Sequence, residues 1–245
     1  MKRQRLRKGL ILVSFLLLPI LLYYFSPVLI LQGAYEGVVT GSFLVFGGMF
    51  TASLVLGRAF CGWACPAGGL QEACLVARDR RVNGRRLDWA KWAIWVPWVA
   101  LIVAFAAMAG GLRRVDPTYQ MQYGLSLSDP PIAAVMVFYI VAGLITVLAF
   151  AVGRRAFCHS ACWMAPFMVL GTKLRNMFKW PALHLESDKA RCIDCKACTA
   201  HCPMSLDVNG MVQRGSMQNA ECILCGTCID GCPKDVIRYA MRQRS

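Results

Sequence analysis

The sequence predicts an all-α membrane domain of four transmembrane helices, built as two repeated hairpins, followed by a small cysteine-rich α+β domain. The composition is the first indication, because 57% of the 245 residues are hydrophobic and only 16% are charged. Soluble domains are roughly 45–50% apolar and about 25% charged, so water alone is a poor solvent for this chain. The second indication is that most of the 13 cysteines fall into repeated patterns.

The apolar residues are concentrated in four segments of 20 to 22 residues. At about 1.5 Å per residue, each covers the roughly 30 Å hydrocarbon core of a bilayer. None of the four contains Asp, Glu, Lys or Arg. Pro19 and Pro27 are expected to kink the first segment, and Pro97 the third. The predicted spans are residues 10–31, 38–57, 92–112 and 131–152.

The positive charges predict the orientation. Of 27 Lys and Arg residues, only Arg113 and Arg114 fall on the side of the membrane opposite to the N-terminus. Under the positive-inside rule, both termini therefore face the cytoplasm, at the inner membrane of a prokaryote. The net charge of +14 then indicates anionic lipids as partners rather than nucleic acid. The predicted divisions are a basic cytoplasmic tail (1–9), the transmembrane domain (10–185) and the cysteine-rich domain (186–245).

The cysteine-rich domain carries the pattern C-x-x-C-x-x-C-x-x-x-C-P twice, 30 residues apart. In two-cluster ferredoxins, each [4Fe–4S] cluster takes three thiolates from one such motif and a fourth from the other. Zinc sites use separated pairs instead, and cytosolic thiols seldom stay oxidised as disulfides. The predicted ligand sets are Cys192, Cys195, Cys198 and Cys232 for one cluster, and Cys222, Cys225, Cys228 and Cys202 for the other.

A second, rarer repeat follows the second and fourth predicted spans. An eight-residue segment begins at Arg58 and recurs 97 residues later at Arg155, with six positions identical. This repeat predicts two copies of a helical hairpin, each ending in a C-x-x-x-C pair whose members share one helix face. The pairs would together hold a third iron–sulfur cluster, cycle as redox-active dithiols, or pack as inert thiols. The four residues are Cys61, Cys65, Cys158 and Cys162.

Four residues near these motifs receive no functional role from the sequence. Arg58 and Arg155 stand where membrane topology alone demands a cation. Cys74 is expected to be a buried apolar filler, and His184 is expected to face solvent.

Several chemistries are excluded by missing residues. All three histidines lie outside the predicted spans, so a haem cannot be held between two of them within the membrane. The sequence contains neither the dinucleotide-binding pattern G-x-G-x-x-G nor a P-loop. It therefore excludes a dinucleotide bound in a Rossmann unit and a nucleotide hydrolysed through a P-loop. The spans also lack ionisable side chains for a proton relay. No catalytic residue can be assigned.

The chain resembles the NapH/MauN type of membrane-bound ferredoxin proteins, within the wider NosR and CcoG (RdxA/FixG) group. The resemblance rests on the four spans, on F-C-G-W-A-C-P after the second, on the related C-x-x-x-C after the fourth, and on the paired C-terminal motifs. One departure is that Trp163, rather than proline, follows Cys162, and a proline comes only at Pro166. This departure predicts a side branch of the group.

The resemblance implies electron transfer at the cytoplasmic membrane. We expect the two ferredoxin clusters to pass single electrons between the membrane side, where quinol or the membrane-edge cysteines act, and a redox partner subunit. The chain would then be an electron-transfer subunit, such as the quinol dehydrogenase component of a larger oxidoreductase. The alternative is a CcoG-like maturation factor that supplies electrons for building a metal centre in a respiratory enzyme.

Overall fold

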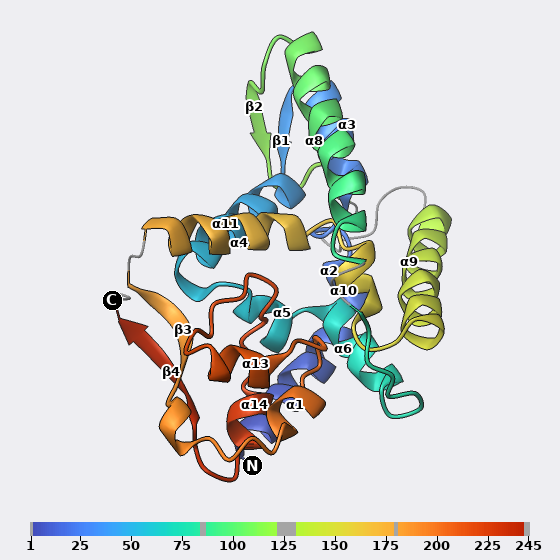
Figure 1. Ribbon diagram of the computed structural model, residues 1–245. Coiled ribbons are helices and arrows are strands. Elements are labelled where there is room, and N and C mark those ends of the chain that lie inside the picture. Colours follow the sequence, from blue (N-terminus) through green and yellow to red (C-terminus); the bar gives the residue numbers. More distant parts are fainter. Residues whose placement is uncertain (1, 84–86, 122–130, 179–180, 243–245) are drawn as a thin grey trace.

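The computed structural model describes residues 2–83, 87–121, 131–178 and 181–242, and it is mostly helical (Figure 1). The first half contains α1 (Lys2–Leu16), α2 (Leu18–Leu21), α3 (Pro27–Tyr35), β1 (Val38–Thr40), α4 (Gly41–Leu56), α5 (Ala59–Trp63), α6 (Pro66–Cys74) and α8 (Ala90–Met108). The second half contains β2 (Arg114–Asp116), α9 (Pro131–Ala151), α10 (Ala156–Ser160), α11 (Ala165–Phe178), β3 (Ala182–Ser187), a 3-10 turn (Lys189–Arg191), α12 (Ala197–Ala200), α13 (Val208–Gln213), α14 (Thr227–Asp230) and β4 (Ile237–Arg242).

The first predicted span, residues 10–31, is broken rather than kinked. The helix α1 ends at Leu16, and α3 begins at Pro27, where the Ser26 hydroxyl accepts a hydrogen bond from the Leu29 amide at 3.4 Å. Pro19 lacks the amide hydrogen that would continue α1, which explains the break before it. The expected basic tail also differs, because residues 2–9 are the first turns of α1.

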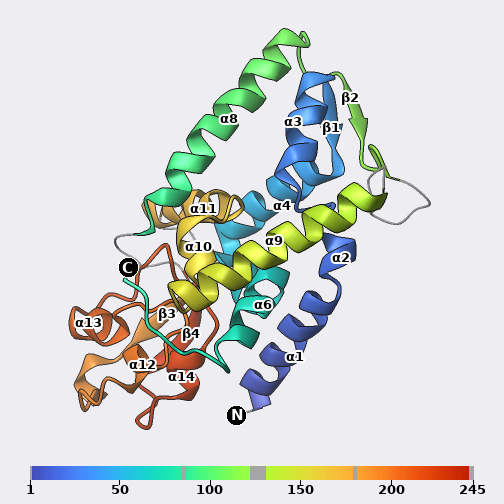
Figure 2. The same ribbon diagram turned by 90° about the vertical axis from the view of Figure 1, so that its right-hand side faces the viewer.

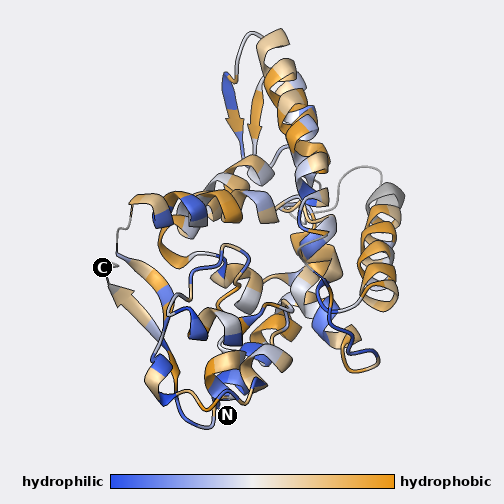
Figure 3. Cartoon of the chain, in the orientation of Figure 1, coloured by the Kyte–Doolittle hydropathy of each residue, from blue (hydrophilic) through white to orange (hydrophobic). Residues whose placement is uncertain are grey.

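The other three spans are helices with shifted ends. The second begins only at Gly41, because residues 38–40 form β1, which pairs in parallel with β2. The third and fourth correspond to α8 and α9. Among the described residues, α8 is long and apolar enough to cross a membrane, whereas the apolar helical stretches Gly41–Leu56 and Val135–Ala151 are shorter. Hydrophobic residues run along α8 and α9 (Figure 3).

The two repeats are joined by exchanged packing. In each repeat an apolar helix leads into a short cysteine-bearing helix and then an amphipathic helix: α4–α5–α6 in the first, and α9–α10–α11 in the second. The helix α6 packs against α9 of the other repeat, and α11 packs against α4 (Figures 1 and 2). Each repeat therefore completes the core of the other.

The cysteine-rich domain is closed by an antiparallel pair of strands, β3 and β4. Its boundary lies earlier than the predicted residue 186, because residues 182–185 already pair with β4, as Leu185 does with Tyr239. The helices α12 and α14, one from each cysteine motif, contact one another, and α14 also contacts β4. Figure 1 shows the N-terminal end of α1 beside α14.

Glycine at position 171 allows α11 to approach α4 closely, which yields a stability prediction. A Cβ atom at Gly171 would fall against Ser53 Oγ and 3.0 Å from the Phe50 carbonyl oxygen. Gly171→Ala should therefore lower the free energy of unfolding by about 1–3 kcal/mol, as overpacking does. Gly47→Ala on α4 is the control, since nothing lies within 4 Å of its Cβ position. Thermal unfolding in detergent measures both, and equal losses would contradict this close approach.

Candidate functional site

The eight cysteines of the two C-terminal motifs line two separate cavities. Each cavity receives three cysteines from one motif and the last cysteine of the other, which is the grouping that their spacing predicts. Four thiols at one cavity are what a cubane cluster requires. One cavity is lined by Cys192, Cys195, Cys198 and Cys232, and we call it the outer cavity. The other is lined by Cys202, Cys222, Cys225 and Cys228, and we call it the inner cavity.

The duplication extends to the backbone of the two motifs. Residues with positive φ occur at equivalent positions 30 residues apart, although L residues other than Gly, Asn and Asp rarely adopt this conformation. Such turns persist only where the surrounding structure enforces them. Both loops are thus bent in the same way around their cavities. The pairs are Asp194 and Leu224, Lys196 and Gly226, and Ser205 and Asp235, with φ between 49° and 74°.

The two cavities differ in their exposure to solvent. Cys195 of the outer cavity is exposed, whereas Cys202, Cys225 and Cys228 of the inner cavity are buried. Burial, followed by neighbouring thiols, raises the pKa of Cys202 to about 11. Because iron binds thiolates, loading such a site releases protons. The outer cavity is accordingly the more accessible of the two from solvent.

The four membrane-edge cysteines are all buried, with at most 3% of each exposed. Cys61 and Cys158 lie in α5 and α10, while Cys65 is the N-cap of α6 and Cys162 precedes α11. The chain therefore leaves the helix between the two cysteines of each pair, and they do not share one continuous helix face as expected. In the second pair, the extra residues before Pro166 include Trp163, whose Nε1 donates to the Phe25 carbonyl oxygen at 2.9 Å.

The exchanged packing brings the two pairs together. Burial and then the charges of Cys61, Cys158 and Cys162 raise the pKa of Cys65, so all four thiols lie within Coulombic reach of one another. Each amphipathic helix also contacts a cysteine of the other repeat. Gln71 Nε2 of α6 donates to Cys158 Sγ at 3.3 Å, and Met168 Sδ of α11 lies 3.8 Å from Cys61 Sγ. We call this group of four thiols the edge site.

Two fully buried arginines lie near the edge site, although sequence analysis assigned no role to either. Both Arg58 and Arg155 have no exposed surface. Burial acts to lower the pKa of Arg58, but the negative charges of Glu221 and the edge thiols override it and raise that pKa. Glu72 and the thiols Cys158 and Cys65 do the same for Arg155. The signal available in the sequence was that arginine recurs at the same position of both repeats.

Some N–H groups of these two arginines have no hydrogen-bond partner among the described residues. Arg58 pairs with Glu221, and Arg155 pairs with Glu72 and donates from Nη1 to the Cys61 carbonyl oxygen at 2.6 Å. Within the described part of the chain, Nε and Nη2 of Arg58 and Nε of Arg155 are buried without a partner. A buried donor without a partner costs free energy. Positive charge and spare N–H groups beside four thiols fit an anionic group such as a thiolate-ligated cluster.

The inner-cavity motif packs directly on the edge site. Trp63 Nε1 donates to the Leu224 carbonyl oxygen at 3.0 Å. A Cβ atom at Gly62 would overlap the carbonyl oxygen of Ile223. Residues 61–63 and 222–225 thus run against each other, and each segment carries cysteines of one site.

The helix α1 reinforces this contact from the N-terminal side. Gln4 Nε2 donates to the Cys225 carbonyl oxygen at 3.0 Å, and Arg3 forms an ion pair with Asp230 at 2.6 Å. Arg3 also lies over the ring of Tyr239. The expected basic tail is therefore a structural part of the ferredoxin contact.

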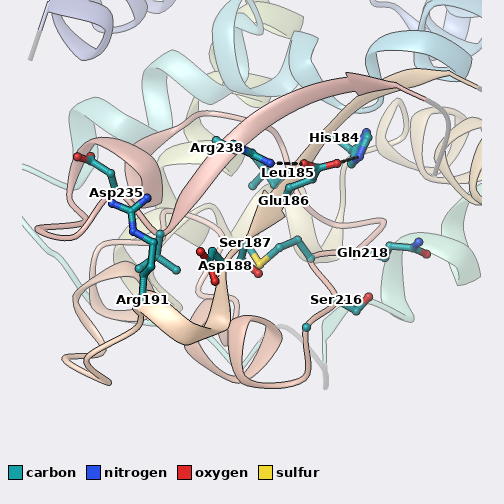
Figure 4. A pocket seen from close by; sticks show the side chains of 13 residues that line it. His184, Leu185, Glu186, Ser187, Asp188, Arg191, Ser216, Gln218, Asp235 and Arg238 are labelled. Carbon is teal, nitrogen blue, oxygen red and sulfur yellow. Dashed lines mark hydrogen bonds and ion pairs between the residues drawn. The ribbon is translucent and has the colours of Figure 1, made fainter. Parts of the chain in front are cut away.

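The remaining candidates lie apart from the cavities. Cys74 is only partly buried, near the C-terminal end of α6. His184 is buried, contrary to expectation, although it lines a groove, and its Nδ1 lies 2.7 Å from the Ala182 carbonyl oxygen. Figure 4 shows His184 and Arg238 on either side of Glu186, in an open polar groove. Among the described residues, no three His, Cys, Asp or Glu side chains are grouped for a single metal ion.

Comparison with protein families matches both parts of the chain. A family described as "4Fe-4S binding domain" matches residues 38–83 and 134–181, which include the edge-site cysteines. A family described as "4Fe-4S dicluster domain" matches residues 191–237, which contain both C-terminal motifs. The internal duplication and the two-cluster domain are thus recognised independently.

Two curated relatives combine these features. The chain is 28% identical over 187 residues to the methylamine utilization ferredoxin-type protein MauN of Methylorubrum extorquens, covering 72% of this chain and 59% of that protein. The chain is similar to the NapH/MauN type of 4Fe-4S ferredoxin protein. It is also 28% identical over 201 residues to the nitrogen fixation protein FixG of Rhizobium meliloti, covering 69% of this chain and 37% of FixG.

The chain spans less than two thirds of the length of each of these relatives. No solved structure matches it. The two iron–sulfur families cover both its edge-site and its ferredoxin cysteines, which supports iron–sulfur clusters as its cofactors.

The cavity assignments predict which cysteines carry iron. Cys225→Ala should remove one cluster, about four iron atoms per chain, because the inner cavity would lack a ligand. Cys74→Ala is the control and should leave the iron content unchanged, since Cys74 lines neither cavity. Iron and acid-labile sulfide in anaerobically purified protein measure both. Equal iron loss in the two variants would contradict the assignment.

Proposed function

We propose that this protein is a membrane-bound electron carrier in which three iron–sulfur sites form one path. The observation that carries the proposal is the direct contact of the inner-cavity motif with the edge site, at Gly62 with Ile223 and at Trp63 with Leu224. Outer and inner cavities already interlock through shared motifs. Electrons would pass among the edge site, the inner cavity and the outer cavity, each of which adjoins the next.

The edge site is proposed to hold a third cluster, with Cys61, Cys65, Cys158 and Cys162 as ligands. Support comes from their common burial, from the spare N–H groups of the nearby arginines, and from the match of both segments to a 4Fe-4S binding family. A bound cluster would supply one-electron redox chemistry. The protein would exclude water, hold the thiolates and compensate their negative charge.

The proposed membrane anchor consists of the apolar segments of the four predicted spans. Apolar side chains on α8 and α9 are widely exposed, as for Val103 at 63% and Ile140 at 64%. Such surface is costly in water and suits lipid. With the positive charges inside, the clusters lie at the cytoplasmic surface, near anionic headgroups. Quinol in the membrane is the proposed electron donor, and a redox partner subunit at the exposed outer cavity is the proposed acceptor.

The iron content tests the third cluster. Wild-type protein should hold about twelve iron atoms, four in each cluster. The double variant Cys61→Ala/Cys158→Ala should hold about eight, because each repeat then lacks one edge ligand while both ferredoxin cavities keep all of theirs. Iron analysis with electron paramagnetic resonance of the reduced protein measures this. Equal iron content in the two proteins would contradict the proposal of a third cluster.

Deletion of the chain in its host separates an electron carrier from a maturation factor. Loss of a carrier should leave the partner enzyme loaded with its metal but unable to draw electrons from quinol. Loss of a maturation factor should leave that enzyme without its metal. Metal analysis of the purified partner, together with its activity from an artificial electron donor, decides between the two functions. A partner that lacks metal would overturn the carrier proposal.

A further inference from the structure

Two carboxylates at the edge site each lie between two buried cations. Glu72 accepts hydrogen bonds from Arg155 and, at 2.8 and 2.9 Å, from Arg7, whose side chain is 3% exposed. Glu221 pairs with Arg58 and, at 2.7 Å, with Lys91, and both cations have no exposed surface. Arg58 and Arg155 occupy equivalent positions of the repeat. Glu221 and Glu72 therefore play the same role, because each pairs with the arginine of one repeat.

The two carboxylates come from different parts of the chain. Glu72 belongs to α6, and its two cations lie on α1 and just before α10, so this group lies outside the ferredoxin domain. Glu221 belongs to the ferredoxin domain and immediately precedes Cys222 of the inner cavity. Its cations lie just before α5 and at the start of α8. The charge balance on one side of the edge site is therefore completed only when the ferredoxin domain is seated.

The cost of leaving this position empty is large. A buried charge that loses its partner is strongly destabilising, because the remaining ion has neither water nor a counter-ion. Without Glu221, Arg58 would lose its only carboxylate among the described residues, and Lys91 would keep only Asp88, at 3.3 Å. Glu221 is also held in place locally, since its own amide donates to Asn219 Oδ1 at 2.8 Å.

We propose that Glu221 is a positioning residue that seats the inner-cavity motif on the edge site and thereby controls electron transfer between them. This inference rests on the proposed function, because the transfer requires a redox centre at the edge site. In each transfer the edge centre loses one electron and the inner-cavity cluster gains it. No covalent bond forms or breaks, and Glu221 neither gains nor loses a proton.

The test compares Glu221→Gln with Glu72→Gln in the full-length, cluster-loaded protein. Both variants remove one negative charge from between two buried cations, so both should raise the reduction potential of the edge centre. Only Glu221→Gln should loosen the seating. We expect faster hydrogen–deuterium exchange of residues 222–226 and electron transfer from the edge centre about tenfold slower or more, because a buried ion pair is broken between the two domains. In Glu72→Gln the exchange should stay near wild type, and electron transfer should slow less than in Glu221→Gln, because only the raised potential of the edge centre acts on it.

Flash reduction followed by rapid-freeze electron paramagnetic resonance measures the transfer rate, and redox titration gives the potentials. Glu221→Asp keeps the negative charge and should restore most of the protection from exchange. This variant keeps the test decisive even if Glu221→Gln loads its clusters poorly. Exchange at residues 222–226 that is unchanged in Glu221→Gln, or equally raised in Glu72→Gln, would overturn the proposal. Wild-type protein with only about eight iron atoms would instead refute the edge cluster, and the exchange comparison would still decide whether Glu221 seats the domain.

Discussion

The architecture depends on placing positive charge where water cannot reach it. Arg58, Lys91 and Arg155 have no exposed surface, and each is stable there only because a carboxylate lies beside it. These cations fix how α1, α6, α10 and the ferredoxin domain meet. They also create the environment in which four thiols can lie together, since a cluster of thiolates without nearby positive charge would repel itself. Structure and redox chemistry thus share one electrostatic requirement.

The parts of the molecule that follow from local sequence rules were the predictable ones. The spacing of the cysteines, read with the ligand pattern of two-cluster ferredoxins, groups the eight thiols as they line the two cavities. Apolar segments gave the positions of α4, α8 and α9 to within a few residues. Kinks were predicted at Pro19 and Pro27, and at these positions the structure instead divides the segment into separate helices.

Long-range contacts were not predictable from one sequence. Arg58 looked like an ordinary juxtamembrane cation, because nothing local reveals that Glu221, 163 residues away, reaches it. Similarly, the basic N-terminal residues suggested a cytoplasmic tail, because nothing local reveals their partners. In the structure, Arg3 donates to Asp230 and Gln4 donates to the Cys225 carbonyl oxygen. The prediction that His184 faces solvent was wrong for a related reason, since His184 lies on β3, whose partner strand β4 is more than 50 residues away in the chain. In each case the decisive partner lies in another part of the fold.

The exchanged packing of the two repeats has a consequence for synthesis. Because α6 rests on α9, and α11 rests on α4, the first hairpin leaves the ribosome with its cysteine pair lacking half of its surroundings. The N-terminal α1 likewise lacks its partner until α14 is made, and α14 is the last helix among the described residues. Assembly of the cluster proposed for the edge site would therefore begin only after nearly the whole chain has emerged from the ribosome.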